Sequence, residues 1–318
     1  MMSQKLLVSF ILVLLTAGCN TADRQQNHQP TDYQAVTALG DTLYTLPADE
    51  ETKTQLNNEL EAARATYDAN PEDIKAVISY GRRTADRANY QEAIRIFSKG
   101  IQQHPESRRL YLYRGKQHIN VRHFDAAIED LKHVTELIFG KKDTAETNKD
   151  TSGKRKLNGS LSTNTWYQLG LAYYMKGAFK KAKNAFEESL RWAPDDDRKA
   201  AVSYWLYMTL RRDGMDDIAG EVLEPISEKM EIDDSEPYQQ LLLVFKGVFK
   251  PDMIQQSINN NTAKDINTTL GYGLGNWHYI NGRADRAEEF FRKVYETDRW
   301  NTYGYIAAET DLARLFEN

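Results

Sequence analysis

The sequence predicts an all-α fold in which paired helices repeat along the chain to form a solenoid. A glycine followed twelve residues later by an alanine recurs, and the pairs Gly81/Ala93 and Gly115/Ala127 lie 34 residues apart, a period typical of helical repeats. Glycine inside a helix lowers its stability by about 1 kcal/mol relative to alanine. Glycines that recur at the same position of each repeat therefore need a compensating contact. We expect them to lie where two paired helices approach closely. An ordinary helical bundle without repeats is the alternative.

Apolar spacing and turn residues define the helices of each repeat. Trp166 and Leu169 are three residues apart and Tyr173 follows four later, so the three share one helix face. A residue with positive φ is expected to end the first helix of a repeat, five residues before the second-helix alanine. The glycines at this place are Gly177, Gly214 and Gly282.

The spacing of the repeats locates an insertion and the two ends of the solenoid. Gly115 and Gly170 are 55 residues apart, which is one period and an insertion of 21, so we expect residues 140–162 to form a polar surface loop. Apolar stripes at 56–67 and within 302–316 predict helices that cap both ends. The repeats are expected at about 74–107, 108–139, 163–196, 200–233 and 268–301, with a degenerate repeat at 234–267.

One repeat resembles a known family motif. Its signature residues match, in order and spacing, those of the tetratricopeptide (TPR) repeat: Trp166, Leu169, Gly170, Tyr173, Ala182, Phe186 and Pro194. The resemblance implies a right-handed TPR-type solenoid of antiparallel helix pairs. The chain departs from the TPR clamp for peptide carboxylates, because Ile78 and Tyr113 stand where Lys and Asn would be needed. A C-terminal carboxylate is therefore not the expected ligand.

The same resemblance implies a concave wall built from the first helix of each repeat. Tyr, Trp and Arg, which dominate binding energy at interfaces, are frequent at the corresponding phases, and acidic residues are rare. The alternative is that part of this stripe packs against the next repeat. The expected partner-binding residues are Arg109, Tyr113, Lys116, Tyr167, Gln168, Leu171, Tyr174, Tyr204, Trp205, Met208, Arg211, Tyr272, Asn276 and Tyr279.

The N-terminus predicts export and lipidation. Lys5 precedes an apolar stretch, residues 6–15, which is too short to span a bilayer and is typical of a signal-peptide core. Small residues directly before Cys19, the sole cysteine of the chain, resemble a bacterial lipoprotein cleavage box. The resemblance implies that residues 1–18 are a lipoprotein signal peptide and that Cys19 carries the lipid. A plain secretory signal with a free thiol is the alternative.

The segment after Cys19 predicts how the fold is attached. Residues 19–49 are rich in Gln, Asn, Thr, Asp and Pro and are expected to be a flexible tether between the lipid bilayer and the solenoid of residues 50–318. Asn20 stands where Asp would signal inner-membrane retention in enteric bacteria. We therefore expect a lipid-anchored protein of the bacterial cell envelope, at the outer membrane, facing either the periplasm or the cell surface.

The sequence shows no catalytic or metal-binding constellation. It contains no HExxH, no Gly-rich phosphate loop and no GxSxG, so we expect neither catalysis nor a cofactor. His118, His123 and His133 form a cluster, but His118 falls at a core position and His123 in a turn, so no metal site is expected. A net charge of −5 argues against a nucleic-acid surface.

The functional hypothesis combines the anchor with the repeats. Residues 71–316 resemble bacterial TPR lipoproteins, and the layout is similar to that of outer-membrane adaptor lipoproteins for cell-wall hydrolases. Segments such as AVSYWLYMTLRRDG and NTYGYIAAETDLARL look like a TPR group of environmental bacteria. The resemblance implies a non-enzymatic adaptor that binds a protein or peptide in its concave groove. The alternative is a module that stacks glycans or another small ligand on the same aromatic rings.

Overall fold

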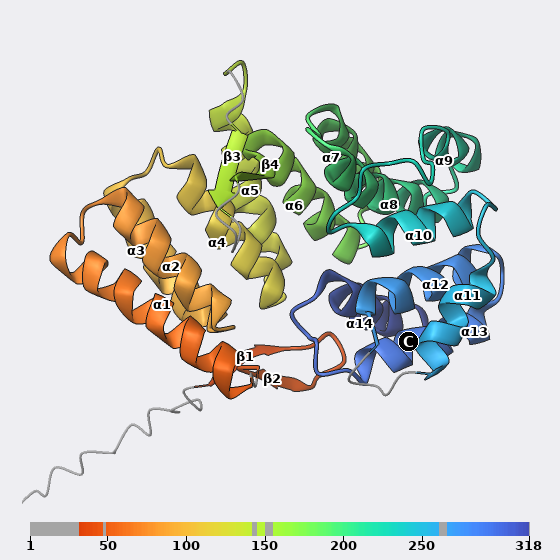
Figure 1. Ribbon diagram of the computed structural model, residues 1–318, viewed down its shortest axis with the longest axis horizontal. Coiled ribbons are helices and arrows are strands. Elements are labelled where there is room, and N and C mark those ends of the chain that lie inside the picture. The colour runs from red at the N-terminus through yellow and green to blue at the C-terminus, as the bar shows by residue number, and fades with distance from the viewer. Residues whose placement is uncertain (1–31, 47–48, 142–144, 150–154, 261–265, 318) are drawn as a thin grey trace, which may run out of the picture. The chain divides into compact units, whose positions relative to one another are not determined.

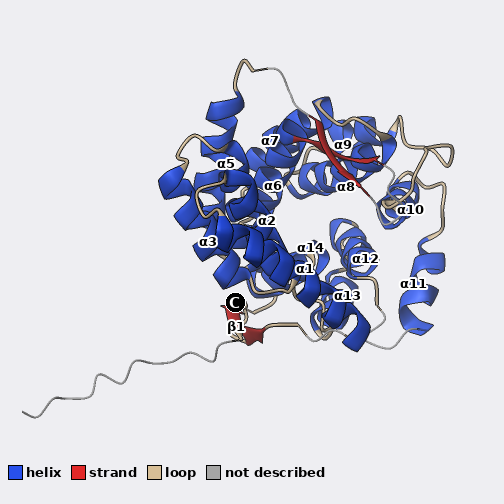
Figure 2. Cartoon of the chain, turned by 60° about the vertical axis from the view of Figure 1, so that its left-hand side comes forward, coloured by secondary structure: helices blue, strands red, loops and turns tan. Residues whose placement is uncertain are grey.

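The fold is a helical solenoid throughout the part of the chain that the structure describes. The computed structural model describes residues 32–46, 49–141, 145–149, 155–260 and 266–317. Within them the chain forms fourteen helices and two short hairpins (Figures 1 and 2). Successive helices pack on one another from α1 to α9 and again from α11 to α14, and the predicted all-α, TPR-type fold is confirmed. The predicted signal peptide and Cys19 lie outside the described residues.

Each predicted repeat corresponds to two helices, although α6 and α8 begin a few residues before the predicted bounds at 163 and 200. The expected first capping helix is α1 (Glu50–Ala69), which packs on α2. None of the helices described here is both long and apolar enough to cross a membrane. The remaining helices are α2 (Ile74–Asp86), α3 (Tyr90–Gln103), α4 (Arg108–Asn120), α5 (Phe124–Ile138), α6 (Leu161–Met175), α7 (Phe179–Arg191), α8 (Asp196–Arg212), α9 (Asp216–Leu223), α10 (Glu236–Phe245), α11 (Pro251–Asn260), α12 (Thr268–Ile280), α13 (Ala284–Tyr295) and α14 (Tyr303–Leu315).

Polar side chains start the first helix of most repeats. Asp73 accepts the backbone N–H of Lys75 at the start of α2, and Ser107 accepts that of Leu110 at the start of α4. Such caps satisfy backbone donors that have no partner inside the helix, and each contributes about 1 kcal/mol. The caps therefore help to define where each inner helix begins.

The repeat glycines bring the paired helices into close contact. A Cβ atom added to Gly170 would lie 2.6 Å from the Phe186 ring, and one added to Gly275 would lie 2.7 Å from the Phe291 ring. Both rings are fully buried. Only glycine lets the first helix lie directly against the ring of the second. The expected close approach is confirmed, and the side chain that faces the glycine is a large one sixteen residues later.

The turns between paired helices use left-handed backbone. The predicted positive φ is confirmed at Gly177, Gly214 and Gly282, with values of 70°, 75° and 74°. In the first two repeats the same place holds Ala88 and Arg122, with φ of 55° and 64°. A residue other than glycine costs roughly 1–2 kcal/mol in this region. Contacts of the Arg122 side chain, described below, offset that cost.

The degenerate repeat departs from the regular pairing. Helices α10 and α11 lie within the predicted span, and Gly247 ends α10 with a φ of 79°. However, α10 packs mainly on α8 and α12, and α11 packs on α12, whereas α10 and α11 make little contact with each other. This pair therefore fills a gap between its neighbours instead of forming an independent helix hairpin.

The prediction of a flexible tether is wrong for its C-terminal part. Strands β1 (Tyr33–Val36) and β2 (Thr42–Tyr44) form an antiparallel hairpin that turns at Gly40, where φ is 96°. Ala35 and Leu43 are buried, with 2% and 7% of their surface exposed. The hairpin is ordered because its inner face packs on helices that are distant in the sequence. The polar composition of this segment did not predict that contact.

The predicted loop at 140–162 also contains regular structure. Strands β3 (Ala145–Lys149) and β4 (Arg155–Ser160) pair antiparallel, and α6 begins at Leu161. The insertion is therefore a hairpin and not an irregular loop. Strand pairing satisfies backbone groups even in a segment with few apolar residues.

The last helix, α14, lies where the terminal capping helix was predicted and packs on α12 and α13. It also packs on α6 of the third repeat, a contact that the sequence analysis did not predict. Tyr305, Ala308 and Leu312 are buried as the stripe predicted, but Glu309 and Asp311 are also fully buried. A helix with carboxylates on its inner side needs cationic partners from other elements, and α8 and the turn after α4 supply them.

His278 on α12 makes stability depend on pH. Its ring stacks on Phe290 at a centroid distance of 5.4 Å, and neither ring nitrogen has a hydrogen-bond partner among the described residues. Burial, helped by repulsion from Arg283 and Arg286, lowers the pKa of His278 to about 4 from 6.5. Between these two values the unfolded chain binds a proton that the folded chain does not. Folding is therefore weakened as the pH falls through this window.

Replacing His278 with Phe should stabilise the fold and flatten its pH dependence. The change keeps the ring stacking and removes two buried nitrogens without partners, a defect that costs about 1–3 kcal/mol. Between pH 7 and pH 5 the wild type should lose about 1–2 kcal/mol more unfolding free energy than the variant. Urea unfolding at the two pH values measures the difference. Equal losses in both proteins would contradict the assignment.

Candidate functional site

A pocket of about 1470 Å³ opens on the side formed by the first helices of the repeats. Its wall comes from α2, α4, α6, the starts of α8, α10 and α12, and the segments 231–235 and 299–303. The last of these segments leads into α14, so the pocket lies between the early repeats and the C-terminal end of the fold. The predicted groove residues that line it are Arg109, Tyr113, Lys116, Tyr167 and Gln168.

The pocket also contains residues that the sequence analysis did not select. Arg82 and Asp86 line it from α2. Counted from the repeat glycine, they stand in the first repeat at positions that were expected to line the groove, and Arg82 is the equivalent of Lys116 in the second repeat. Applying the same phases to the first repeat would have found them. The segment 299–303 carries no such signal, because it reaches the pocket only through contacts between distant parts of the chain.

The remaining predicted groove residues do not line this pocket, and most are core residues. The first helices of the third, fourth and last repeats converge, with α12 packed on both α8 and α10. The side chains that were predicted to line the groove in these repeats therefore pack on one another and leave no space for a partner. Arg211 and Tyr279 keep partial exposure but lie elsewhere. The residues that are fully or almost fully buried are Leu171, Tyr174, Tyr204, Trp205, Met208, Tyr272 and Asn276.

An aromatic cluster fills this converged interior. Tyr174 packs edge-on against Trp205 at 5.1 Å, and Trp205 stacks on Tyr272 at 5.9 Å. The hydroxyl groups of Tyr174 and Tyr272 form a 2.6 Å hydrogen bond, and Tyr272 donates to Asp311 at 2.9 Å. Burial raises the pKa of both tyrosines. These rings are therefore structural, and a substitution such as Trp205→Ala would open a cavity.

Asp311 is the buried charge beneath the aromatic cluster. Arg212 donates two hydrogen bonds to its carboxylate, at 2.9 and 3.1 Å, and Arg314 forms a second ion pair. Burial alone would raise the pKa of Asp311, but attraction to Arg212 and Arg314 and the hydrogen bonds hold it below its usual value. The carboxylate is therefore charged at neutral pH and joins α8 to α14.

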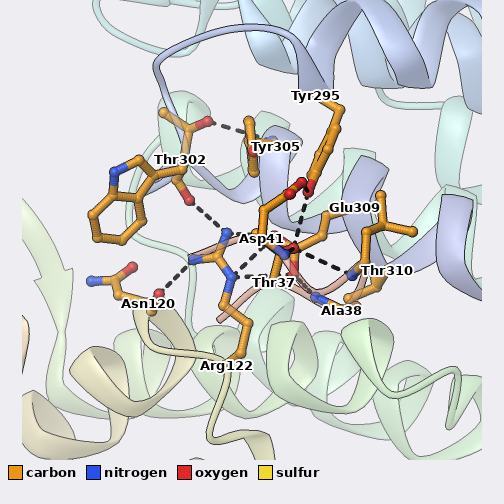
Figure 3. A network of polar contacts seen from close by, with 12 residues as sticks. Thr37, Ala38, Asp41, Asn120, Arg122, Tyr295, Thr302, Tyr305, Glu309 and Thr310 are labelled. Carbon is orange, nitrogen blue, oxygen red and sulfur yellow. Dashed lines mark hydrogen bonds and ion pairs between the residues drawn. The ribbon is translucent and has the colours of Figure 1, made fainter. Parts of the chain in front are cut away.

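A second buried ion pair holds the 299–303 wall of the pocket in place. Arg122, from the turn after α4, binds Glu309 of α14 (Figure 3) with an Nη2–Oε2 distance of 2.6 Å. The same nitrogen donates to the Trp300 carbonyl at 2.9 Å. The side chains of Arg122 and Glu309 are 6% and 0% exposed. The Arg122 guanidinium also lies over the Trp300 ring, 5.5 Å from its centroid.

The β1–β2 hairpin completes this junction from a third direction. The backbone N–H of Ala38 donates to Glu309 at 2.7 Å (Figure 3), and the Trp300 indole donates to the Tyr44 carbonyl at 3.1 Å. At its other end, the Gln34 carbonyl accepts a 2.6 Å bond from the Gln91 side chain on α3. The hairpin therefore bridges the first repeat and the last one. We name the Arg122–Glu309 pair with these hairpin contacts the closure junction.

Charges on the pocket wall are held in different ways. Asp195 caps α8 by accepting the N–H of Arg198, and Asp197 accepts the N–H groups of Asp233, Asp234 and Ser235. Burial alone would raise the pKa of Asp197, but these hydrogen bonds hold it below the usual value. These two carboxylates therefore organise the wall itself.

Lys116, unlike these two carboxylates, is a charged residue of the pocket wall whose side chain makes no hydrogen bond to the described part of the fold. Its side chain is accessible through the pocket, but enough protein surrounds it that desolvation lowers its pKa, and repulsion from Arg82 and Arg198 adds to this effect against attraction to Asp86. Within the described residues Lys116 makes no hydrogen bond or ion pair. It is therefore a cation to which the fold itself supplies no direct partner.

The histidine cluster does not assemble into a ligand set. His118 and His123 lie 5.9 Å apart between ring centroids, whereas His133 packs against Tyr111. Burial, with repulsion from Arg114 and His123, lowers the pKa of His118 to about 4. In the part of the chain that the structure describes, no three His, Cys, Asp or Glu side chains gather as metal ligands would.

Comparison with known proteins identifies the repeat type. Residues 163–196, the third predicted repeat, match the model of the tetratricopeptide repeat. Among solved structures, the chain is similar to a tetratricopeptide repeat protein from Parabacteroides merdae ATCC 43184, with 14% identity over 81% of this chain and 94% of that one and a TM-score of 0.48. YrrB, described as a TPR protein with an unusual peptide-binding site, shares 13% identity over 74% and 92% of the chains, with a TM-score of 0.43. No curated protein matches the chain.

Replacing Glu309 with Gln should break the closure junction. The change leaves the buried Arg122 guanidinium without a charged partner, which costs about 3–5 kcal/mol of unfolding free energy. Urea unfolding measures the loss. Glu317→Gln is the matched control, because its ion pair with Arg292 is about half exposed and should be worth at most about 1 kcal/mol. Similar stability of the two variants would show that the junction does not hold the fold.

Proposed function

We propose that this protein is a non-enzymatic adaptor that holds an extended segment of a partner protein in the pocket. The proposal depends mainly on the pocket, which is lined by the inner helices of successive repeats. Its volume of about 1470 Å³ exceeds the roughly 300–1,000 Å³ of typical small-molecule sites. A peptide segment can occupy such a space and contact several helices at once.

Glycan binding is less well supported by the arrangement of the rings. Of the groove rings on which that hypothesis depended, Tyr174, Tyr204, Trp205 and Tyr272 present no exposed face. Tyr113 lines the pocket and is partly exposed, but Phe97 and Arg82 lie against its ring. Tyr167, which lines the pocket, is 4% exposed, and the Tyr303 hydroxyl donates to Gln168 at 2.7 Å. Sugar stacking needs accessible rings, so a peptide is the better candidate.

We further propose that the adaptor is attached to the bacterial outer membrane through a lipid on Cys19. The support is the sequence around this residue, where an apolar stretch and small residues precede a sole cysteine. Acyl chains contribute about 0.8 kcal/mol per buried methylene, so a multiply acylated cysteine is a stable anchor.

Photo-crosslinking in cells tests the adaptor function. Benzoyl-phenylalanine in place of Tyr113 or Arg299, both on the pocket wall, should crosslink to one short segment of one partner, identified by mass spectrometry. The control carries the same group in place of Trp192, whose side chain is 44% exposed and lies outside the pocket. Crosslinks of the same partner segment from Trp192 but not from the pocket would refute the proposed site.

Substitution of Cys19 by Ser tests the anchor. We expect the variant to lose incorporation of an alkyne-labelled palmitate and to shift from the membrane fraction to the soluble fraction. Ser203→Cys, at a buried position on α8, restores a thiol in the Cys19→Ser background and should not restore the label. A variant that still carries the label, or wild type that carries none, would rule out lipidation at Cys19.

A further inference from the structure

We propose that the pocket selects partner segments rich in side-chain carboxylates, an inference that rests on the proposed adaptor function. Three cations on the pocket wall, Arg82, Lys116 and Arg299, carry it. They come from α2, α4 and the 299–303 segment, so they are distributed around the space and not gathered at one point. Several negative charges along an extended segment match this distribution better than one terminal carboxylate does.

In the described part of the chain, the fold gives these cations no directly bonded acidic partner, although Asp86 lies near enough to Lys116 to attract it. Within the described residues, the side chains of Arg82, Lys116 and Arg299 form no hydrogen bond or ion pair. Arg82 lies over the Tyr113 ring at 5.3 Å from its centroid, which orients the guanidinium but does not neutralise its charge. A cation in a recess gains more from an incoming anion than a fully exposed one, because less water screens the attraction.

Two of the three cations, Arg82 and Lys116, lie on the same wall of the pocket because they hold equivalent positions in neighbouring repeats. Arg82 and Lys116 are 34 residues apart and so occupy the same place on the inner helices of neighbouring repeats. Desolvation lowers the pKa of Lys116, attraction to Asp86 opposes this effect, and repulsion from Arg82 and Arg198 adds to it, so Arg82 and Lys116 lie close enough for their charges to interact. An anionic ligand relieves that repulsion, whereas a cationic one increases it.

Acidic residues also line the pocket, but the best defined of them are used by the fold. Asp195 caps α8, and Asp197 accepts three backbone N–H groups from residues 233–235. These two carboxylates and those of Glu231, Asp233 and Asp234 lie in the 195–197 and 231–234 segments, whereas Asp86 lies on α2 with Arg82. An acidic peptide can therefore contact Arg82, Lys116 and Arg299 while its neutral residues face these carboxylates.

Peptide binding to the full-length protein in detergent tests the inference. The probe is a fluorescein-labelled peptide of alternating Glu and Ser, compared by anisotropy with peptides in which Gln or Lys replaces every Glu. We expect the Glu peptide to bind at least about tenfold more tightly than the Gln peptide, with affinity falling as salt rises. Equal affinities, or tighter binding of the Lys peptide, would overturn the inference, as would binding of inorganic polyphosphate with none of the Glu peptide.

Variants of two of the cations, Lys116 and Arg82, connect the preference to the pocket. Lys116→Gln should weaken binding of the Glu peptide about tenfold, Arg82→Gln should act in the same direction, and Lys116→Arg should restore most of the affinity. The control is Arg95→Gln, because Arg95 on α3 is 71% exposed and lies outside the pocket. An equal loss in Arg95→Gln and Lys116→Gln would refute the site.

The two proposals can fail separately. Crosslinks from Tyr113 to a partner, without a preference for the Glu peptide, would refute the charge selectivity and leave the adaptor function standing. Charge-selective peptide binding, without pocket crosslinks in cells, would refute the adaptor function.

Discussion

The Arg122–Glu309 ion pair is the contact on which the form of the pocket depends. It joins the turn of the second repeat to the last helix, and both partners are almost completely buried. A buried carboxylate without a cation is strongly destabilising, so arrangements that separate these two elements are disfavoured. The strained backbone of Arg122, with φ of 64°, is tolerated because its guanidinium satisfies Glu309 and two backbone carbonyls, those of Asn120 and Trp300. We interpret the pair as a device for specifying one arrangement, since buried ion pairs often add little net stability.

One repeating pattern produces two different environments in this chain. Where α6, α8 and α12 converge, the positions that face inward become core, and Tyr174, Trp205 and Tyr272 pack on one another. Where α2 and α4 face the 299–303 segment, equivalent positions line an open pocket. The difference follows from how far apart opposing elements lie, because rings that can reach each other exclude water and a partner. The buried Asp311 then gives the converged side a polar network that ties α8 to α14.

Some charged residues of the pocket are bonded to the fold, and others are available to a ligand. Asp195 and Asp197 satisfy backbone donors, so their charges are part of the wall. Lys116 receives no comparable contact and is held where its charge is unfavourable. In a chain with a net charge of −5, the pocket thus holds Arg82, Lys116 and Arg299 without ion-pair partners among the described residues, alongside six carboxylates. The fields of such cations guide oppositely charged partners and reject similarly charged ones, which gives specificity more than raw affinity.

Local spacing was sufficient to predict the helices, the glycine contacts and the turns of this protein. Those features depend on residues within one repeat, as the contact of Gly170 with Phe186 illustrates, and short-range sterics decide them. The lipid on Cys19 is likewise a prediction from adjacent residues, and that part of the chain lies outside the described structure. Tertiary structure alone decided that Tyr204 and Trp205 are core while Arg82 lines a pocket, and that residues 33–44 form a hairpin. These outcomes depend on contacts such as Ala38 with Glu309, 271 residues apart, and no periodic pattern encodes which distant segments will meet.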